Sequence, residues 1–214
     1  MSTQVRFLVD GFNVYHAIRE VRHRTGADCR WLDLRRLCES LLHTVGGGAE
    51  AAEIYYFSAL ARHLEKSRPG TVARHERYLS ALRATGVVTQ LGVFKPKDVR
   101  YHSATCDVHL RRHEEKETDV AIAAATVEAA AARDCGALVL VSGDTDLLPA
   151  LRTARRLRPQ MKLICLFPPY RSNQAFRACV DGTFKIAPAQ LARHLLPDPL
   201  VSPESRAIAK PAEW

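Results

Sequence analysis

Residues 137–151, ALVLVSGDTDLLPAL, bring two aspartates to the end of a short apolar run. The run at 137–142 predicts a buried strand, and LLPALRTARRL at 147–157 predicts a helix. Asp144 and Asp146 therefore lie in the connection from a strand to a helix. In a parallel α/β sheet such connections gather at the carboxyl edge of the strands, where ligands bind. This stretch predicts both an α/β fold and the location of its site.

The same alternation of strand and helix extends along the chain in both directions. Further strands are expected at 5–10, 51–60, 87–94, 161–167 and 183–186, the last of them at an edge. Further helices are expected at 11–24, 31–43, 71–85, 118–133, 173–180 and 188–196. Residues 95–116 are polar and basic, and we expect them to be irregular. The pattern predicts an α/β fold with a central, mainly parallel sheet and right-handed crossovers.

Four aspartates are expected at the carboxyl edge of this sheet: Asp10, Asp119, Asp144 and Asp146. Asp10 ends the first strand, and Asp119 opens the helix that leads into the fourth. All four converge if the first and fourth strands are neighbours, as in flavodoxin-like orders. Carboxylates held close together repel unless some are protonated or a cation neutralises them. Hard oxygen ligands of this kind suit Mg²⁺ or Mn²⁺.

Each aspartate taken alone also has a structural explanation. Asp119 near a helix N-terminus gains about 0.3–1 kcal/mol from the helix dipole. Asp144 can cap the helix that follows it, and Asp10 can close a turn before Gly11. Only their convergence favours a metal site.

Composition limits the classes of partner and compartment. The 214 residues carry 31 Lys and Arg against 23 Asp and Glu, a net charge of +8, which favours a nucleic-acid partner. No apolar run reaches the length of a membrane span, no signal peptide is expected at the N-terminus, and the six cysteines are scattered. We therefore expect a cytoplasmic protein with no membrane partner. One domain is expected at 1–196, followed by a flexible proline-rich tail at 197–214.

The usual sequence motifs for nucleotide binding are missing. No GxxxxGK[ST] loop occurs, and no GxGxxG follows the first strand. A DxD phosphatase would need an acid at position 12, which is Phe12. We therefore expect no nucleotide cofactor.

Three stretches of the chain resemble the NYN domain, a branch of the PIN-like metal-dependent ribonucleases: VDGFNVYHAI, EKETDVAIAAA and ALVLVSGDTDLLPAL. The resemblance spans about residues 5–187, and Leu147 stands where the family pattern has an aromatic residue. It implies a PIN-like three-layer α/β/α fold. It also implies metal-binding and catalytic roles for Asp10, Asp119, Asp144 and Asp146. By the same match, Asn13 orients water or substrate, and Ser142 supports the site.

The function expected from these observations is hydrolysis of RNA phosphodiester bonds by a metal-dependent endoribonuclease. Two alternatives remain open: a non-catalytic RNA-binding or protein-interaction module of the same fold, and a nuclease acting on DNA or structured tRNA. A homo-oligomer is also left open. Residues expected to hold flanking phosphates are Lys95, Lys97, Lys116, Arg171 and Arg177. Tyr170 is a candidate for base stacking, whereas Phe176 is expected in the core.

The polar segment contains the spacing H-x₃-C-x₂-H-x₃-H, formed by His102, Cys106, His109 and His113. These residue types are zinc ligands, but the spacing matches no standard zinc signature. We expect no zinc there, and we expect the segment to be a mobile basic loop that orders over the active site when RNA binds.

Overall fold

The computed structural model describes residues 2–103 and 106–214, and the side chains outside residues 99–111. Its central sheet has the strand order β4-β3-β2-β1-β5-β6-β7. The strands are β1 (Thr3–Asp10), β2 (Ala49–Ala59), β3 (Val88–Ser103), β4 (Cys106–Lys116), β5 (Ala137–Val141), β6 (Lys162–Phe167) and β7 (Gly182–Lys185). All neighbours pair in parallel except β3 and β4, which are antiparallel.

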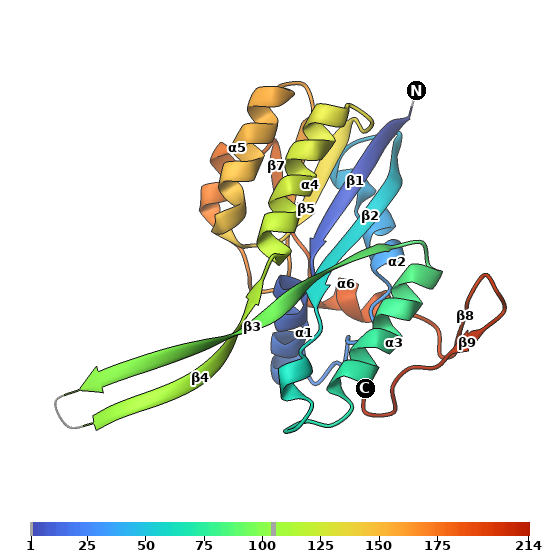
Figure 1. Ribbon diagram of the computed structural model, residues 1–214. Coiled ribbons are helices and arrows are strands. Elements are labelled where there is room, and N and C mark those ends of the chain that lie inside the picture. The colour runs from blue at the N-terminus through green and yellow to red at the C-terminus, as the bar shows by residue number, and fades with distance from the viewer. Residues whose placement is uncertain (1, 104–105) are drawn as a thin grey trace.

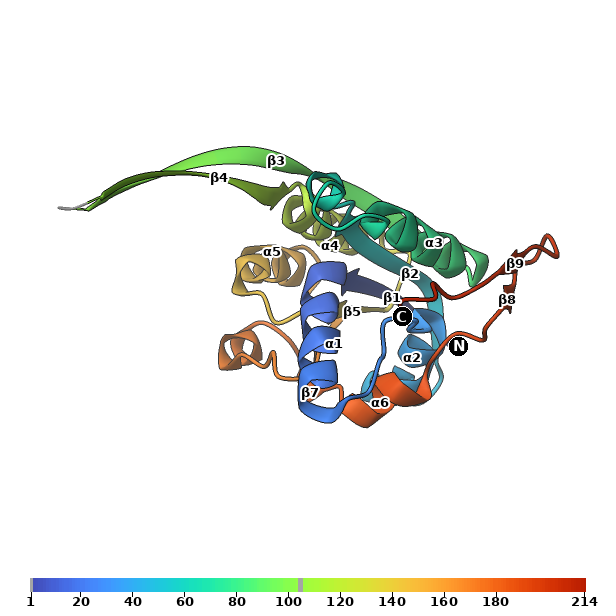
Figure 2. The same ribbon diagram turned by 90° about the horizontal axis from the view of Figure 1, so that it is seen from below.

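Helices cover both faces of the sheet (Figures 1 and 2). The α-helices are α1 (Gly11–Thr25), α2 (Leu34–Ser40), α3 (Thr71–Ala84), α4 (Thr118–Ala132), α5 (Leu148–Leu157) and α6 (Pro188–Arg193). Short 3-10 helices are η1 (Leu42–Thr44), η2 (Arg62–Leu64), η3 (Thr145–Leu147) and η4 (Gln174–Ala178). Buried residues of α1, α2, α3 and α6 pack in one core cluster, and those of α4 and α5 pack in another. The predicted three-layer, mainly parallel α/β fold is confirmed. Within the described residues, no helix is both long enough and apolar enough to cross a membrane.

Successive side chains of β1 point alternately into the two core clusters, which lie on opposite faces of the sheet. Val5, Phe7 and Val9 belong to the cluster beneath α1, whereas Leu8 belongs to the cluster beneath α4 and α5. Successive side chains of a strand point to opposite faces, so an apolar residue at every position predicts burial on both sides. The near-continuous apolar run of β1 is therefore the signature of a central strand.

The switch in strand order lies at β1, which pairs with β2 on one side and β5 on the other. The first and fourth parallel strands are therefore neighbours, as convergence of the four aspartates requires. The analogy to flavodoxin-like orders was wrong, however. Leaving out the antiparallel β4, the order is the other doubly wound one, 3-2-1-4-5-6. Ligands of such sheets bind at the carboxyl edge beside the switch.

The described residues at 95–103 and 106–116 form strands and are not irregular, contrary to our expectation. Residues 88–92 of β3 pair with β2, and its remainder pairs with β4 from Val93↔Lys116 to Ser103↔Cys106. This two-stranded arm, residues 93–103 and 106–116, projects from the body of the protein (Figures 1 and 2). The described side chains at residues 95–98 and 112–113 are all exposed, so this part of the strands carries no apolar alternation from which it could be predicted.

The root of the arm is anchored by stacked rings. Phe94 of β3 meets Phe12 of α1 edge to face, with ring centroids 5.7 Å apart. His113 of β4 stacks on His63 of η2, with centroids 4.3 Å apart and an interplanar angle of 8°. These contacts fix the base of the arm beside the first turn of α1.

The predicted helix at 31–43 is shorter in the structure. The side chain of Asp33 accepts a 3.0 Å hydrogen bond from the backbone N–H of Arg36 and caps α2. Trp31 and Leu32 precede this cap and are buried, so their apolar character reflects core packing rather than helical periodicity.

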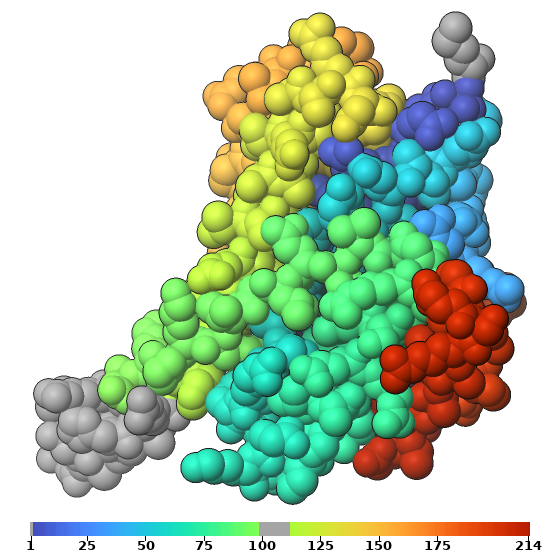
Figure 3. Space-filling model, turned by 45° about the vertical axis from the view of Figure 1, so that its right-hand side comes forward, coloured from blue at the N-terminus to red at the C-terminus, as the bar shows by residue number. Residues whose placement is uncertain are grey.

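The proline-rich tail packs against the body instead of forming a flexible appendage. It contains the short pair β8 (Leu200–Val201) and β9 (Ala207–Ile208) and lies over the surface beside α3 (Figure 3). The Trp214 ring lies 5.8 Å from Tyr78 and 6.2 Å from Trp31, centroid to centroid. One terminal aromatic side chain thus supplies the apolar anchor that the composition of the tail did not suggest.

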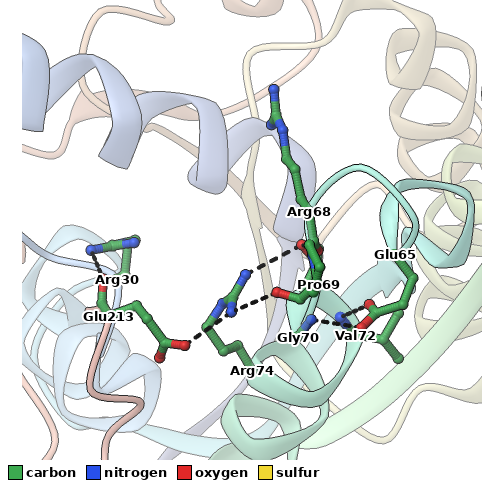
Figure 4. A network of polar contacts seen from close by, with 9 residues as sticks. Arg30, Glu65, Arg68, Pro69, Gly70, Val72, Arg74 and Glu213 are labelled. Carbon is green, nitrogen blue, oxygen red and sulfur yellow. Dashed lines mark hydrogen bonds and ion pairs between the residues drawn. The ribbon is translucent and has the colours of Figure 1, made fainter.

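Polar contacts hold the same region in place (Figure 4). Arg74 of α3 forms a 3.2 Å ion pair with Glu213, and Arg30 donates a 2.7 Å hydrogen bond to the Glu213 carbonyl. The Glu65 carboxylate accepts hydrogen bonds from the backbone N–H groups of Gly70 and Val72, at 2.6 and 3.0 Å. The start of α3 and the end of the chain are therefore joined by one polar network.

Candidate active site

Asp10 is the buried member of the acidic cluster. It ends β1 and caps α1, and it accepts hydrogen bonds from the Asn13 backbone N–H (2.9 Å) and the Ser142 hydroxyl (2.7 Å). Burial raises the pKa of Asp10, whereas these two hydrogen bonds oppose the rise. Repulsion from Asp144 and Glu115 raises that pKa further. A buried carboxyl that lies close to other acids favours a proton or a cation as its partner.

The loop after β5 is held by Ser142 and carries two of the aspartates. The Ser142 oxygen accepts a 3.1 Å hydrogen bond from the Asp144 backbone N–H. Asp144 is half-buried and caps η3 by accepting a 3.0 Å hydrogen bond from the backbone N–H of Asp146. Asp146 is exposed. The capping role predicted for Asp144 is thus real, and it holds the carboxylate beside Asp10.

Asn13 links the connection after β1 to the connection after β5. Its side-chain oxygen accepts a 3.1 Å hydrogen bond from the backbone N–H of Gly143. The segment after β6 packs against Gly143. The contact is so close that a Cβ at Gly143 would lie 2.0 Å from the Arg171 carbonyl oxygen. Asn13 therefore positions the loop that carries Asp144 and Asp146, a role beyond the one expected for it.

Asp119 approaches the cluster from α4. It lies in the first turn of that helix and is exposed to solvent. Partial desolvation raises its pKa to about 6, with further contributions from Asp10, Glu115, Asp144 and Asp146. These electrostatic interactions show that the four predicted aspartates, from three different connections, share one region of the carboxyl edge.

Glu115 is a fifth carboxylate that our sequence prediction missed. It lies near the end of β4 and accepts a 3.1 Å hydrogen bond from the Thr118 backbone N–H. It raises the pKa values of both Asp10 and Asp119. The signal was present in the stretch EKETD, residues 115–119, but its first acid was left out of the predicted site.

The backbone around Glu115 is closely packed. A Cβ at Gly92 would lie 2.5 Å from the Lys116 carbonyl oxygen and 3.2 Å from a Glu115 carboxylate oxygen. Glu117 has φ 80°, a left-handed conformation that costs free energy in a residue other than glycine. The turn from β4 to α4 is thus constrained on both sides, and this constraint places Glu115 and Asp119 near the site.

The chemistry of this donor set fits a hard divalent cation, because every candidate ligand is a carboxylate oxygen. Within the described residues, however, no three His, Cys, Asp or Glu side chains already form a ready ligand group. Asp119 and Asp146 are exposed, so both can change rotamer without disturbing the core. A cation would have to draw these side chains together against their mutual repulsion.

The lysines predicted to contact RNA lie around the root of the arm and are exposed. Lys95 forms a 3.3 Å ion pair with Glu117, and Lys116 forms one of 3.0 Å with Glu114. Lys97 also pairs with Glu114. Exposed pairs of this kind contribute little free energy, so phosphates can replace the glutamates as partners.

The other residues predicted to contact RNA differ in their surroundings. Arg171 lines a pocket beside α1, and Arg177 is exposed on η4. Phe176 is fully buried, and its ring centroid lies 5.4 Å from that of Phe167, so its assignment to the core is confirmed. The ring of Tyr170 is covered by the Arg24 guanidinium at 4.5 Å.

The candidate zinc segment lies largely outside the described side chains. This holds for His102, Cys106 and His109, whereas His113 stacks on His63. Cys106 and His113 lie on one continuous strand, β4, which separates their Cα atoms by about 23 Å at 3.3 Å per residue. His113 therefore cannot share an ion with Cys106.

The mainly parallel sheet with helices on both faces is consistent with the three-layer fold of the PIN-like class of proteins. The family model of the NYN domain matches residues 4–187, and the chain belongs to this family. NYN domains have a nuclease-like fold. No curated protein matches the chain.

A similar solved structure is that of a protein of unknown function from Vibrio parahaemolyticus. It is 18% identical in sequence, with a TM-score of 0.56, and the match covers 87% of this chain and 94% of the other. This likeness supports the fold alone.

Proposed function

We propose that the protein is a metal-dependent endoribonuclease. The observation that carries the proposal is the gathering of acids at the carboxyl edge, where Ser142 binds both Asp10 and the backbone of Asp144 and where Asp119 interacts electrostatically with both of these acids. Such coupling among acids at the switch point of a doubly wound sheet favours a functional site over independent helix caps. The NYN family, whose fold is that of PIN-like nucleases, supports the same assignment.

Asp10, Asp119, Asp144 and Asp146 would hold Mg²⁺ or Mn²⁺, the ions that such nucleases typically use. The bound cation supplies charge neutralisation at the phosphate and lowers the pKa of the attacking water. Hydrolysis in line with the leaving oxygen yields a 5′-phosphate and a 3′-hydroxyl.

The protein's own residues prepare the site for this chemistry. Ser142 and the Asn13 backbone N–H hold both oxygens of Asp10 in fixed directions. The Asn13 side chain fixes the loop that carries Asp144 through its bond to Gly143. The side-chain amide nitrogen of Asn13 is a donor for a water or a substrate oxygen. Because these positions are set before the substrate arrives, little reorganisation is needed during reaction.

RNA is proposed as the substrate because the chain is basic and has exposed cations beside an acidic site. The net charge is +8, and the lysines at the root of the arm have only weak, exposed partners. The five cysteines among the described side chains are all free and buried, which fits a reducing compartment such as the cytoplasm.

The decisive test is cleavage of single-stranded RNA, structured RNA and DNA by purified protein with Mn²⁺ or with EDTA. The Asp144→Asn and Asp10→Asn variants serve as matched controls, since each keeps the shape of the side chain and removes its charge. We expect cleavage only by the wild type with the metal present, and both variants to remain folded. Binding of RNA without cleavage would indicate a non-catalytic module, and cleavage of DNA alone would identify the other alternative. Equal cleavage by both variants would show that the activity comes from a contaminant.

A further inference from the structure

A second site lies beside the acidic cluster, on the exposed face of α1. An open pocket of about 300 Å³ is lined by His16, Arg19, Glu20, His23 and Arg171. The first four come from successive turns of α1, and Arg171 comes from the loop between β6 and η4. Figure 2 looks onto this edge of the sheet, with α1 in the foreground. None of these residues was predicted to form a site except Arg171.

The charge of the pocket is positive. Its one acid, Glu20, is paired at 2.5 Å with Arg24 in the next turn of α1, outside the pocket lining. Within the part of the chain that the structure describes, the guanidinium groups of Arg19 and Arg171 form no ion pair with an acid. Burial lowers the pKa of His16, and the positive charges of Arg171 and Arg19 lower it further. Glu20 also interacts electrostatically with Arg171, so the pocket holds two arginines against one acid, which is shared with Arg24.

The pocket lies near the acidic cluster, although no acid of the cluster lines it. His16 lies three residues after Asn13, one helical turn along α1, and Asn13 binds Gly143 in the loop that carries Asp144. The loop that carries Arg171 packs directly against the same Gly143. Asp10 caps α1, and His16 and Arg19 follow it by six and nine residues, so a ligand that bridges the acidic cluster and the pocket follows α1 over about two turns.

A metal ion is the other ligand to consider, because His16, Glu20 and His23 recur at helical spacing along α1. Two observations oppose it. Glu20 is already engaged by Arg24, and two guanidinium groups line the same pocket. A cation entering this pocket would meet two like charges, whereas an anion would meet two partners.

We infer that this pocket binds a phosphate group of the RNA chain, next to the phosphodiester that is cleaved. The inference rests on the proposed function, because that function makes RNA the ligand. It adds a second place, besides the acidic cluster, at which the protein holds the RNA chain. Arg19 and Arg171 would clamp the phosphate oxygens, and His16 and His23 would donate further hydrogen bonds. Fixing a neighbouring phosphate sets the register of the RNA, so that one bond is presented to Asp10, Asp119 and Asp144.

The first test does not depend on cleavage. Inorganic phosphate is titrated into the Asp144→Asn variant while the ring protons of His16 and His23 are followed by NMR across pH. We expect phosphate, but not an equal concentration of chloride, to raise the pKa of His16, because an anion favours the protonated ring. The Arg19→Gln/Arg171→Gln double variant should lose this response. An unchanged His16 titration at saturating phosphate would overturn the inference.

The second test measures affinity for a short single-stranded RNA in the same Asp144→Asn background. Loss of Arg19 and Arg171 should weaken binding about tenfold and reduce the salt slope by about 0.7 for each phosphate that the protein no longer neutralises. The control is Arg156→Gln, which removes an exposed arginine from the last turn of α5, on the opposite face of the sheet. An equal loss in the control would show a general charge effect and would overturn the specific pocket.

The affinity measurement is made with two versions of the same RNA, one with a 5′-phosphate and one with a 5′-hydroxyl. Equal affinity identifies an internal phosphodiester as the occupant, and preference for the 5′-phosphate identifies a chain end. Both results keep the phosphate pocket. If wild-type protein cleaves RNA but the double variant binds it normally, the pocket is wrong and the nuclease stands. If phosphate shifts the His16 titration but no RNA is cleaved, the anion site stands and the proposed nuclease activity fails.

Discussion

The hydroxyl of Ser142 donates a 2.7 Å hydrogen bond to Asp10, so the ends of the two strands beside the switch in strand order are joined through one side chain. The same oxygen accepts from the Asp144 backbone N–H at 3.1 Å, and the Ser142 carbonyl accepts from the Cys165 thiol at 3.3 Å. Ser142 is fully buried. It therefore joins the β1–α1 connection to the β5–η3 connection, contacts β6, and holds Asp10 and the Asp144 backbone together.

Ser142→Ala tests this role. The change leaves a buried Asp10 oxygen and the Asp144 N–H without their partner, so we expect the free energy of unfolding to fall by about 1–3 kcal/mol. Urea denaturation measures this fall, and Ser80→Ala, an exposed helical serine, is the control. Cleavage should fall as well, because Asp10 loses a donor that favours its charged form. Equal stability of Ser142→Ala and Ser80→Ala would contradict the linking role.

Asp119 should make metal binding depend on pH. With a pKa of about 6, its carboxyl is protonated below that value and must lose the proton before it binds a cation. Affinity for Mn²⁺ should therefore fall as the pH drops below 6, by about tenfold per pH unit for one linked proton. Calorimetry in buffers of different ionisation enthalpy measures the proton released.

In the absence of metal, the effect of Asp119 on stability changes with pH in the opposite direction from that of most aspartates, whose pKa falls on folding. The folded state raises the pKa of Asp119 from 3.8 to about 6, so the folded protein binds more protons in this window. Its contribution to stability is present below pH 3.8 and is lost as the pH rises through about 6. Asp119→Asn should therefore melt at a higher temperature than the wild type at pH 7, and the difference should shrink toward pH 4. Equal melting temperatures of the variant and the wild type at pH 7 would show that the neighbouring acids do not destabilise ionised Asp119.

The convergence of the four aspartates was predictable because each follows or precedes an element with a strong local signal. The apolar runs that end at Asp10 and Ser142 are buried on both faces, as their unbroken hydrophobicity indicates. The neighbouring position of their strands follows from one assumption about strand order, and the pairing of β1 with β5 confirms it.

Features that depend on contacts far apart in the sequence were not predictable. The arm has paired strands, but its described side chains at residues 95–98 and 112–113 are exposed, and most of them are charged, so no apolar alternation marks these strands. Glu115 joins the site only because the arm returns along β3 and ends beside Asp10, so its role depends on a pairing that was not foreseen. The tail was misjudged because one residue, Trp214, packs against Trp31 and Tyr78.

The arm should contribute to RNA affinity through its root. Replacing Lys95 and Lys97 with alanine should reduce the salt slope of RNA binding, by about 0.7 for each phosphate of a single strand that these lysines neutralise. Their ion pairs with Glu117 and Glu114 are exposed, so stability should change by less than about 0.5 kcal/mol. Lys185→Ala/Lys210→Ala removes the same charge elsewhere. Identical salt slopes for the two double variants would show that the arm does not contact RNA.

Gly143 allows the two halves of the carboxyl edge to pack together, and Gly143→Ala tests that contact. The new Cβ would lie 2.0 Å from the Arg171 carbonyl oxygen, so the loop that carries Arg171 must move. Such overpacking costs about 1–3 kcal/mol. RNA affinity should also fall, since Arg171 would leave the pocket beside α1.

Gly47→Ala is the matched control, because a Cβ there meets nothing within 4 Å and Gly47 has no positive φ. We expect it to change stability by less than about 0.5 kcal/mol and to leave RNA affinity unchanged. The comparison separates packing from the general effect of replacing a glycine. If Gly143→Ala were as stable as Gly47→Ala but bound RNA more weakly, the loop would have moved at no cost and Arg171 would still be implicated. If both variants matched the wild type in stability and affinity, the close contact between Gly143 and Arg171 would not exist in solution, and the acidic cluster and the pocket beside α1 would be independent sites.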